Sequence, residues 1–228
     1  MHQHKTLLAA TALLGAAMAL PTAPARAASH ASTAQDRVDA AVQVVDRMKQ
    51  NPELARLLEH AQGVFIIPRY GKGAFIVGGQ GGDGVVLAKH DGNWTDPAFF
   101  NIAGGSIGLQ AGGSGGAVAM ILMTRNAIHR FEDTDTSWTL SGKAGLSIVP
   151  FSDRGRTNSR NGDVIVWSDA RGLYGGLTAG ATHISPETKL DRAYYQGQAN
   201  PRDILLGSVT NHGADSLRDA LATRVAQK

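Results

Sequence analysis

Cysteine is absent from the 228 residues of this sequence. Its absence excludes disulfide bonds, thiolate metal sites and a lipid-modified cysteine, so packing alone must stabilise the fold. Charged residues are scarce as well, at 18% of the chain, where roughly 25% is usual. Proline is rare, with 8 residues against 43% hydrophobic ones, which excludes a disordered chain. This composition predicts one packed domain.

Long apolar runs are confined to the N-terminus. Lys5 precedes an apolar run over residues 7–20, and the small-residue site Ala25-Arg26-Ala27 follows it. This order is typical of a secretory signal peptide, which we expect to be cleaved after Ala27. No later run reaches the ~20 apolar residues of a transmembrane helix. The mature protein is therefore expected to be exported, into the periplasm.

Loss of residues 1–27 would remove two of the 22 basic side chains and leave 20 against 19 acidic ones, a net charge of +1. A chain this close to neutral has no overall positive potential that would attract nucleic acid, so any electrostatic attraction must come from local patches.

Four segments are expected: a signal peptide (1–27), a short linker (28–35), a domain (36–210) and a C-terminal helix (211–228) that packs on the domain or trails it.

Helices are predicted at both ends of the mature chain. Ser32 and Gln35 have capping-box spacing, and apolar residues then recur at three- and four-residue steps over residues 38–48. Asn51-Pro52 begins a second helix, with Asn as N-cap and Pro in the first turn. A last helix is predicted at residues 216–226.

Between these helices the hydrophobic period changes to two, which indicates strands. The clearest alternation runs from Trp138 to Ile148 and leaves one face polar, which favours an antiparallel sheet. The predicted fold is α+β: an antiparallel meander of about seven strands, strongly coiled into a sandwich or half-barrel and flanked by N-terminal and C-terminal helices. Strands are expected within 64–67, 74–77, 85–88, 99–111, 118–123, 138–148, 164–168 and 173–184.

Glycine is abundant, with 28 residues, and GGQGGDG at 78–84 matches the dinucleotide fingerprint G-x-G-x-x-G. That motif needs a helix after the glycines, whereas the apolar run 85–88 and an Asp91-Gly92 turn follow here. Nucleotide binding is therefore not expected, and the stretch is interpreted as a hairpin connection. The glycines could serve a tightly coiled sheet or a close backbone approach, and both explanations stay open.

Catalytic and metal motifs are weak. The pattern G-x-S-x-G occurs around Ser106 and Ser114. With Asp133 and His183, Ser106 would give the chain order Ser, Asp, His of a serine hydrolase. The motif requires a turn from a strand into a helix after the serine, and neither serine is expected at such a turn. The eight histidines show no metal-site spacing. No catalytic residue, metal, cofactor, nucleotide or nucleic acid is expected.

Basic residues cluster locally on the predicted N-terminal helices, near the first turn of the sheet and in one polar loop. Such clusters, on amphipathic helices and a loop, could contact anionic lipid head groups. A solvated helix face and a solvated loop are the alternative, since acidic residues share the helices. The candidate lipid-binding residues are Arg37, Arg47, Lys49, Arg56, Arg69, Lys72, Arg154, Arg156 and Arg160.

Several stretches, in order, resemble the SYLF domain family. The resemblance covers residues 36–210, and it departs from the family pattern at 178–181, where TAGA replaces a Leu-Glu-Gly-like run. The matching stretches are AQGVFIIP (61–68), GKGAFIVGGQGGDGVVLA (71–88), GNWTDPAFF (92–100), SIGLQAGG (106–113), ILMTRNAIHRF (121–131), GLYGGLTAGATHI (172–184) and AYYQGQANPRDIL (193–205).

The resemblance implies a lipid-binding module rather than an enzyme. Eukaryotic members of the family bind phosphoinositides and some yeast members associate with actin, but an exported protein would meet neither. The expected partner is therefore an anionic phospholipid or a membrane surface. Two alternatives stay open: an envelope scaffold that binds another protein through a sheet edge, and a serine hydrolase on Ser106 or Ser114. The lipid's identity and the oligomeric state are not predicted.

Overall fold

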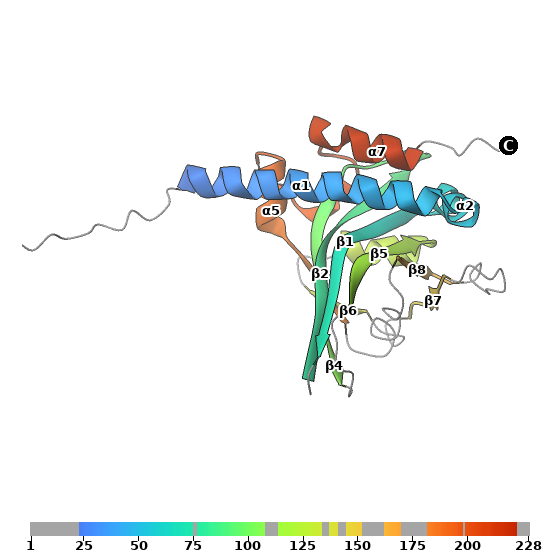
Figure 1. Ribbon diagram of the computed structural model, residues 1–228. Coiled ribbons are helices and arrows are strands. Elements are labelled where there is room, and N and C mark those ends of the chain that lie inside the picture. Colours follow the sequence, from blue (N-terminus) through green and yellow to red (C-terminus); the bar gives the residue numbers. More distant parts are fainter. Residues whose placement is uncertain are drawn as a thin grey trace, which may run out of the picture.

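The computed structural model is a curled half-barrel sheet with helices at both ends of the chain (Figure 1). It describes residues 23–74, 77–107, 114–133, 137–140, 145–151, 162–169, 182–197 and 199–222. The helices are α1 Ala23–Lys49, α2 Pro52–His60, α3 Arg125–Glu132, α5 Thr188–Tyr194, α6 Pro201–Leu205 and α7 Asp215–Ala222, with a short 3-10 helix η3 at His212–Ala214. The strands are β1 Gly63–Ala74, β2 Val77–His90, β3 Asn93–Trp94, β4 Ala98–Ile107, β5 Ser114–Leu122, β6 Trp138–Leu140, β7 Ile148–Pro150, β8 Val164–Ser168 and β9 Thr182–Pro186.

The sheet confirms the predicted α+β half-barrel but not the meander. Its strands follow the order β6-β9-β4-β2-β1-β5-β8-β7, and β3 pairs with β2 beside this path. The hairpin of β1 and β2 forms the centre, β4 adds to the β2 side and β5 to the β1 side. Strand β7 runs parallel to β8, so the sheet is mixed rather than purely antiparallel. Two parallel strands must be joined by a crossover connection. The predicted meander, in which short turns join neighbouring strands, contains no such connection.

The glycine stretch 78–84 lies inside β2, so its interpretation as a hairpin connection is wrong. A Cβ at Gly82 would come within 2.4 Å of the Arg69 carbonyl oxygen, and one at Gly84 within 2.3 Å of the Ile66 carbonyl oxygen. The register of β1 shifts between Ile66 and Arg69, which is a bulge that presses β1 against β2. Close backbone approach therefore explains these two glycines.

Pro68 lies in this bulge and does not end the strand, because a bulge tolerates a residue without an amide proton.

Helix α1 begins earlier than the capping pattern predicts. Ser32 lies within the helix, where its Oγ donates to the Ser29 carbonyl at 3.0 Å, so it does not cap an N-terminus. The helix takes in residues 28–35, treated above as a linker, and the expected cleavage after Ala27 falls within it. The N-cap at Asn51 is confirmed: its side chain accepts the amides of Glu53 and Leu54.

The alternating segment Trp138 to Ile148 is not one strand. Its ends form β6 and β7, which lie at opposite ends of the sheet order. Gly145 has φ +73°, a left-handed conformation that breaks an extended backbone. Residues 141–144 lie outside the described residues, as does the part of the predicted strand 173–184 that precedes β9.

Two apolar cores lie on the two faces of the sheet. Helices α1, α2, α5 and α7 pack on one face, and α3 and α6 on the other. On the first face α1 lies along the sheet with α7 above it (Figure 1). The apolar stripe of α1 is fully buried there, in agreement with its predicted periodicity; it comprises Ala34, Val38, Ala41, Val44, Val45 and Met48.

Candidate binding site

Arg37, the first predicted lipid-binding residue, is tied into the fold. Its Nη1 pairs with Glu187, just before α5, and its Nη2 lies 3.7 Å from the Asp83 carboxylate of β2. Its guanidinium also lies 5.8 Å from the centre of the Phe99 ring. Only 11% of the side chain is exposed. Arg37 therefore clamps α1 to the sheet and to α5.

Arg47 and Lys49 also have partners within the protein. Arg47 Nη2 lies 3.4 Å from Asp169, after β8. The Lys49 ammonium donates to the Ala220 carbonyl of α7, and burial lowers the pKa of Lys49. Both cations therefore help to hold α1 in place.

The remaining predicted residues are dispersed. Arg56 on α2 and Arg69 on β1 are exposed. Arg69 shares a pocket of about 150 Å³ with Arg37, but Asp36 and Asp83 also line it, which offsets the positive charge. Lys72 lies on β1, opposite Gln80 of β2. Arg154, Arg156 and Arg160 lie outside the described residues.

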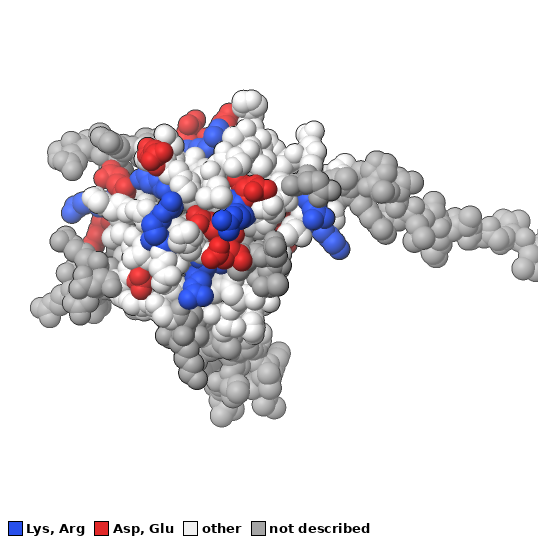
Figure 2. Space-filling model, turned by 180° about the vertical axis from the view of Figure 1, so that it is seen from behind, with Lys and Arg blue, Asp and Glu red and all other residues white. Residues whose placement is uncertain are grey.

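The structure reveals a second group of cations, which the sequence analysis missed. Lys189 and Arg192 are exposed on α5, three residues apart and thus on one side of the helix. Helix α5 packs beside α1, whose first thirteen residues, 23–35, contain no acidic side chain. This part of α1 extends past the sheet with α5 beneath it (Figure 1). Elsewhere charges of both signs alternate, as on the face in Figure 2.

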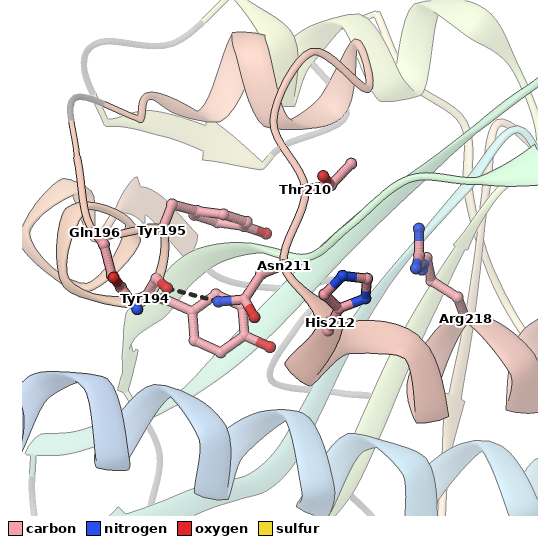
Figure 3. A pocket seen from close by; sticks show the side chains of 7 residues that line it. All are labelled: Tyr194, Tyr195, Gln196, Thr210, Asn211, His212 and Arg218. Atoms are coloured by element: carbon pink, nitrogen blue, oxygen red, sulfur yellow. Dashed lines mark hydrogen bonds between the residues drawn. The ribbon is translucent and has the colours of Figure 1, made fainter.

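A pocket of about 470 Å³ opens next to this surface (Figure 3). Tyr194, Tyr195 and Gln196, at the end of α5, line one side of it. His212 and Arg218, from η3 and α7, line the other. A second pocket of about 580 Å³ shares Tyr194 and Gln196 with it and continues to Ala28 and Ala31 of α1. The two form one groove along α1, α5 and η3.

Asn211 fixes the floor of this groove. Its Nδ2 donates to the Tyr194 carbonyl at 2.6 Å, and its Oδ1 accepts the Gly213 amide at 2.8 Å (Figure 3). The backbone amide of Asn211 donates to the Asp96 carboxylate. The η3 turn is thus tied both to α5 and to the segment between β3 and β4.

Arg218 lies between two carboxylates. Its Nη1 is 3.1 Å from Asp96 Oδ1, and its Nη2 pairs with Asp215. Burial raises the pKa of the Asp96 carboxyl, although the Asn211 amide and Arg218 act against that rise. The hydrogen bond from Arg218 lowers the pKa of Asp215. Two carboxylates surround one guanidinium, so this end of the groove has no excess positive charge.

Tyr194 and Gln196 are the unusual residues of the groove. The Tyr194 side chain is 3% exposed, and its hydroxyl has no hydrogen-bond partner. Burial raises the pKa of this phenol. Gln196 adopts φ +52° directly after the cap of α5, and Gly197 N donates to the Arg192 carbonyl at 3.1 Å, so this is the left-handed position with which many helices end. The buried hydroxyl of Tyr194 is destabilising as long as it has no partner. Neither is visible from sequence.

The hydrolase arrangement is not assembled in the described residues. Asp133 Oδ1 is 3.3 Å from Arg202, while His183 Nδ1 is 3.2 Å from Thr139 Oγ1. Ser106 lies in the second-last position of β4, and Ser114 is the first residue of β5. The described residues contain no group of three or more potential metal ligands. Among the described helices, none combines the length and the apolar character needed to span a bilayer.

Comparison with known proteins places this sequence in a family. A family model for Ysc84, described as Las17-binding protein actin regulator, matches residues 103–224. The SH3 domain-containing YSC84-like protein 1 of Bos taurus is 28% identical over 160 residues, covering 68% of this chain and 46% of that protein. Its counterpart in Xenopus laevis is 28% identical over 163 residues, covering 67% and 47%.

The chain thus spans about half the length of the relatives that it matches. No solved structure matches it. The family model covers more than half of the chain, including the strands β5, β8 and β9 and the whole Tyr194–Arg218 pocket. The chain therefore belongs to the Ysc84 family, also called the SYLF domain family.

Proposed function

We propose that this protein is an exported, non-enzymatic lipid-binding module that docks on anionic membrane surfaces. The observation that supports this most directly is the exposed pair Lys189 and Arg192 on α5. Helix α5 packs beside α1, whose residues 28–35 contain no acidic side chain and would remain after cleavage at Ala27. Family membership agrees with a binding role. An anionic surface attracts each nearby basic residue by roughly 1 kcal/mol, so a small cationic cluster gives weak, reversible binding.

The packing of α1 limits how it can contribute. Its apolar stripe is buried on the sheet, so insertion of that stripe into lipid would first require α1 to leave the core. The exposed side of its first turns, at Ala28, Ser29 and His30, is available without any rearrangement. We therefore propose a superficial contact in which α1 stays folded on the sheet.

The basic residues predicted from sequence differ in how readily they can contact a membrane. Arg56 and Arg69 are exposed and can contribute to the attraction, as can Arg154, Arg156 and Arg160 of the polar loop. Arg37, Arg47 and Lys49 already have intramolecular partners, so a membrane would have to compete with these contacts.

Liposome flotation tests the proposal. The protein should float with vesicles containing phosphatidylglycerol and not with pure phosphatidylcholine, and flotation should fall with salt because charges are screened beyond roughly 8 Å at physiological ionic strength. The Lys189→Glu/Arg192→Glu variant should lose most of the flotation. An Arg125→Glu/Arg202→Glu variant makes the same change in net charge on the α3 and α6 face and should float like the wild type. Equal flotation with neutral vesicles, or an equal loss in both variants, contradicts the proposal.

A second candidate is an envelope scaffold that binds a protein. The family description, Las17-binding protein actin regulator, names a protein partner. The sheet ends at β6 and β7, three-residue strands to which a partner strand could add. One stoichiometric protein partner in a pull-down, with no lipid in the purified sample, would favour this candidate over the first.

A further inference from the structure

We draw no further inference here: the strongest candidate, the largely exposed strip on the α1 side of the sheet where β1, β2, β4 and β5 place Gly71, Gly79, Gly81, Ala103 and Gly115 on one face, presents no side chain larger than a methyl group, and nothing in the described part of the structure shows what covers it.

Discussion

Arg37 on α1 and Glu187, just before α5, form an ion pair across 150 residues of sequence. The same guanidinium lies near Asp83 on β2, so one side chain joins three elements. Arg37 is one of the residues predicted to bind lipid, but its side chain instead holds elements of the fold together.

Replacement of this side chain should destabilise the protein. Arg37→Ala leaves the Glu187 carboxylate without its partner, and we expect a loss of roughly 1.5–3 kcal/mol in the free energy of unfolding. Arg56→Ala, on the exposed side of α2, should change it by no more than about 0.5 kcal/mol. Urea denaturation of both variants measures the difference, and equal stabilities would show that the ion pair contributes nothing.

Asp191 should make stability depend on pH. Burial raises the pKa of its carboxyl to about 8, against roughly 3.9 in an unfolded chain. Between these values the unfolded state loses the proton and the native state keeps it, so this group's contribution falls as pH rises from about 4 to 8 and then levels off.

The Asp191→Asn variant removes the titration and keeps the acceptor for the Phe99 amide, which lies 2.9 Å from Asp191 Oδ1. The stability of the wild type relative to this variant should therefore decline across pH 5–8, by at most about 1.4 kcal/mol per pH unit. Urea denaturation at each pH measures it. A pH-independent difference would mean that the buried carboxyl is already ionised.

Glycines within β2 should differ sharply in their tolerance of alanine. At Gly84 a Cβ would lie 2.3 Å from the Ile66 carbonyl oxygen and 2.7 Å from the Phe65 ring, so Gly84→Ala should cost about 1–3 kcal/mol or more. At Gly79 a Cβ meets nothing within 4 Å, and Gly79→Ala should be neutral or stabilise by about 0.5–1 kcal/mol. Thermal denaturation compares the two. Similar changes in Tm at both sites would show that close backbone approach does not explain Gly84.

The buried Tyr70 and the half-buried Tyr195 should respond in opposite ways to loss of their hydroxyls. The Tyr70 hydroxyl is buried without a partner, and burial raises its pKa to about 12. Tyr70→Phe should therefore be neutral or stabilising. The Tyr195 hydroxyl donates to the Pro97 carbonyl at 2.8 Å, and Tyr195→Phe should cost roughly 1 kcal/mol. The Tm of each variant relative to the wild type shows whether stability rises or falls. A lower Tm for Tyr70→Phe would indicate that the Tyr70 hydroxyl binds a water molecule.

Local signals predict element boundaries reliably where the stabilising group lies nearby in the chain. Asn51 caps α2 through amides two and three residues ahead, and Asp91-Gly92 forms a turn with positive φ at both positions. The capping box at Ser32 failed because the α1 backbone was already helical before it.

Long-range features could not be predicted in the same way. The stretch 78–84 has the composition of a connection, and only its pairing with the β1 bulge explains why glycines are needed in a strand. The run from Trp138 to Ile148 has the right alternation for one strand, but its two ends pair with different neighbours. Strand order depends on which distant segments bury one another, and alternation alone does not encode that choice.

The sequence by itself determined the apolar positions, most helices, the α+β class and the family resemblance, because periodicity, caps and motifs act between near neighbours. Only the tertiary structure decided which cations remain free for a ligand and which are used in the fold. It pairs Arg37 with Glu187, and it places Tyr194 and Gln196 opposite Arg218. The physical reason is that charge pairing, burial and pocket geometry arise from contacts between segments far apart in the chain, whose chemistry cannot be assigned before those segments meet.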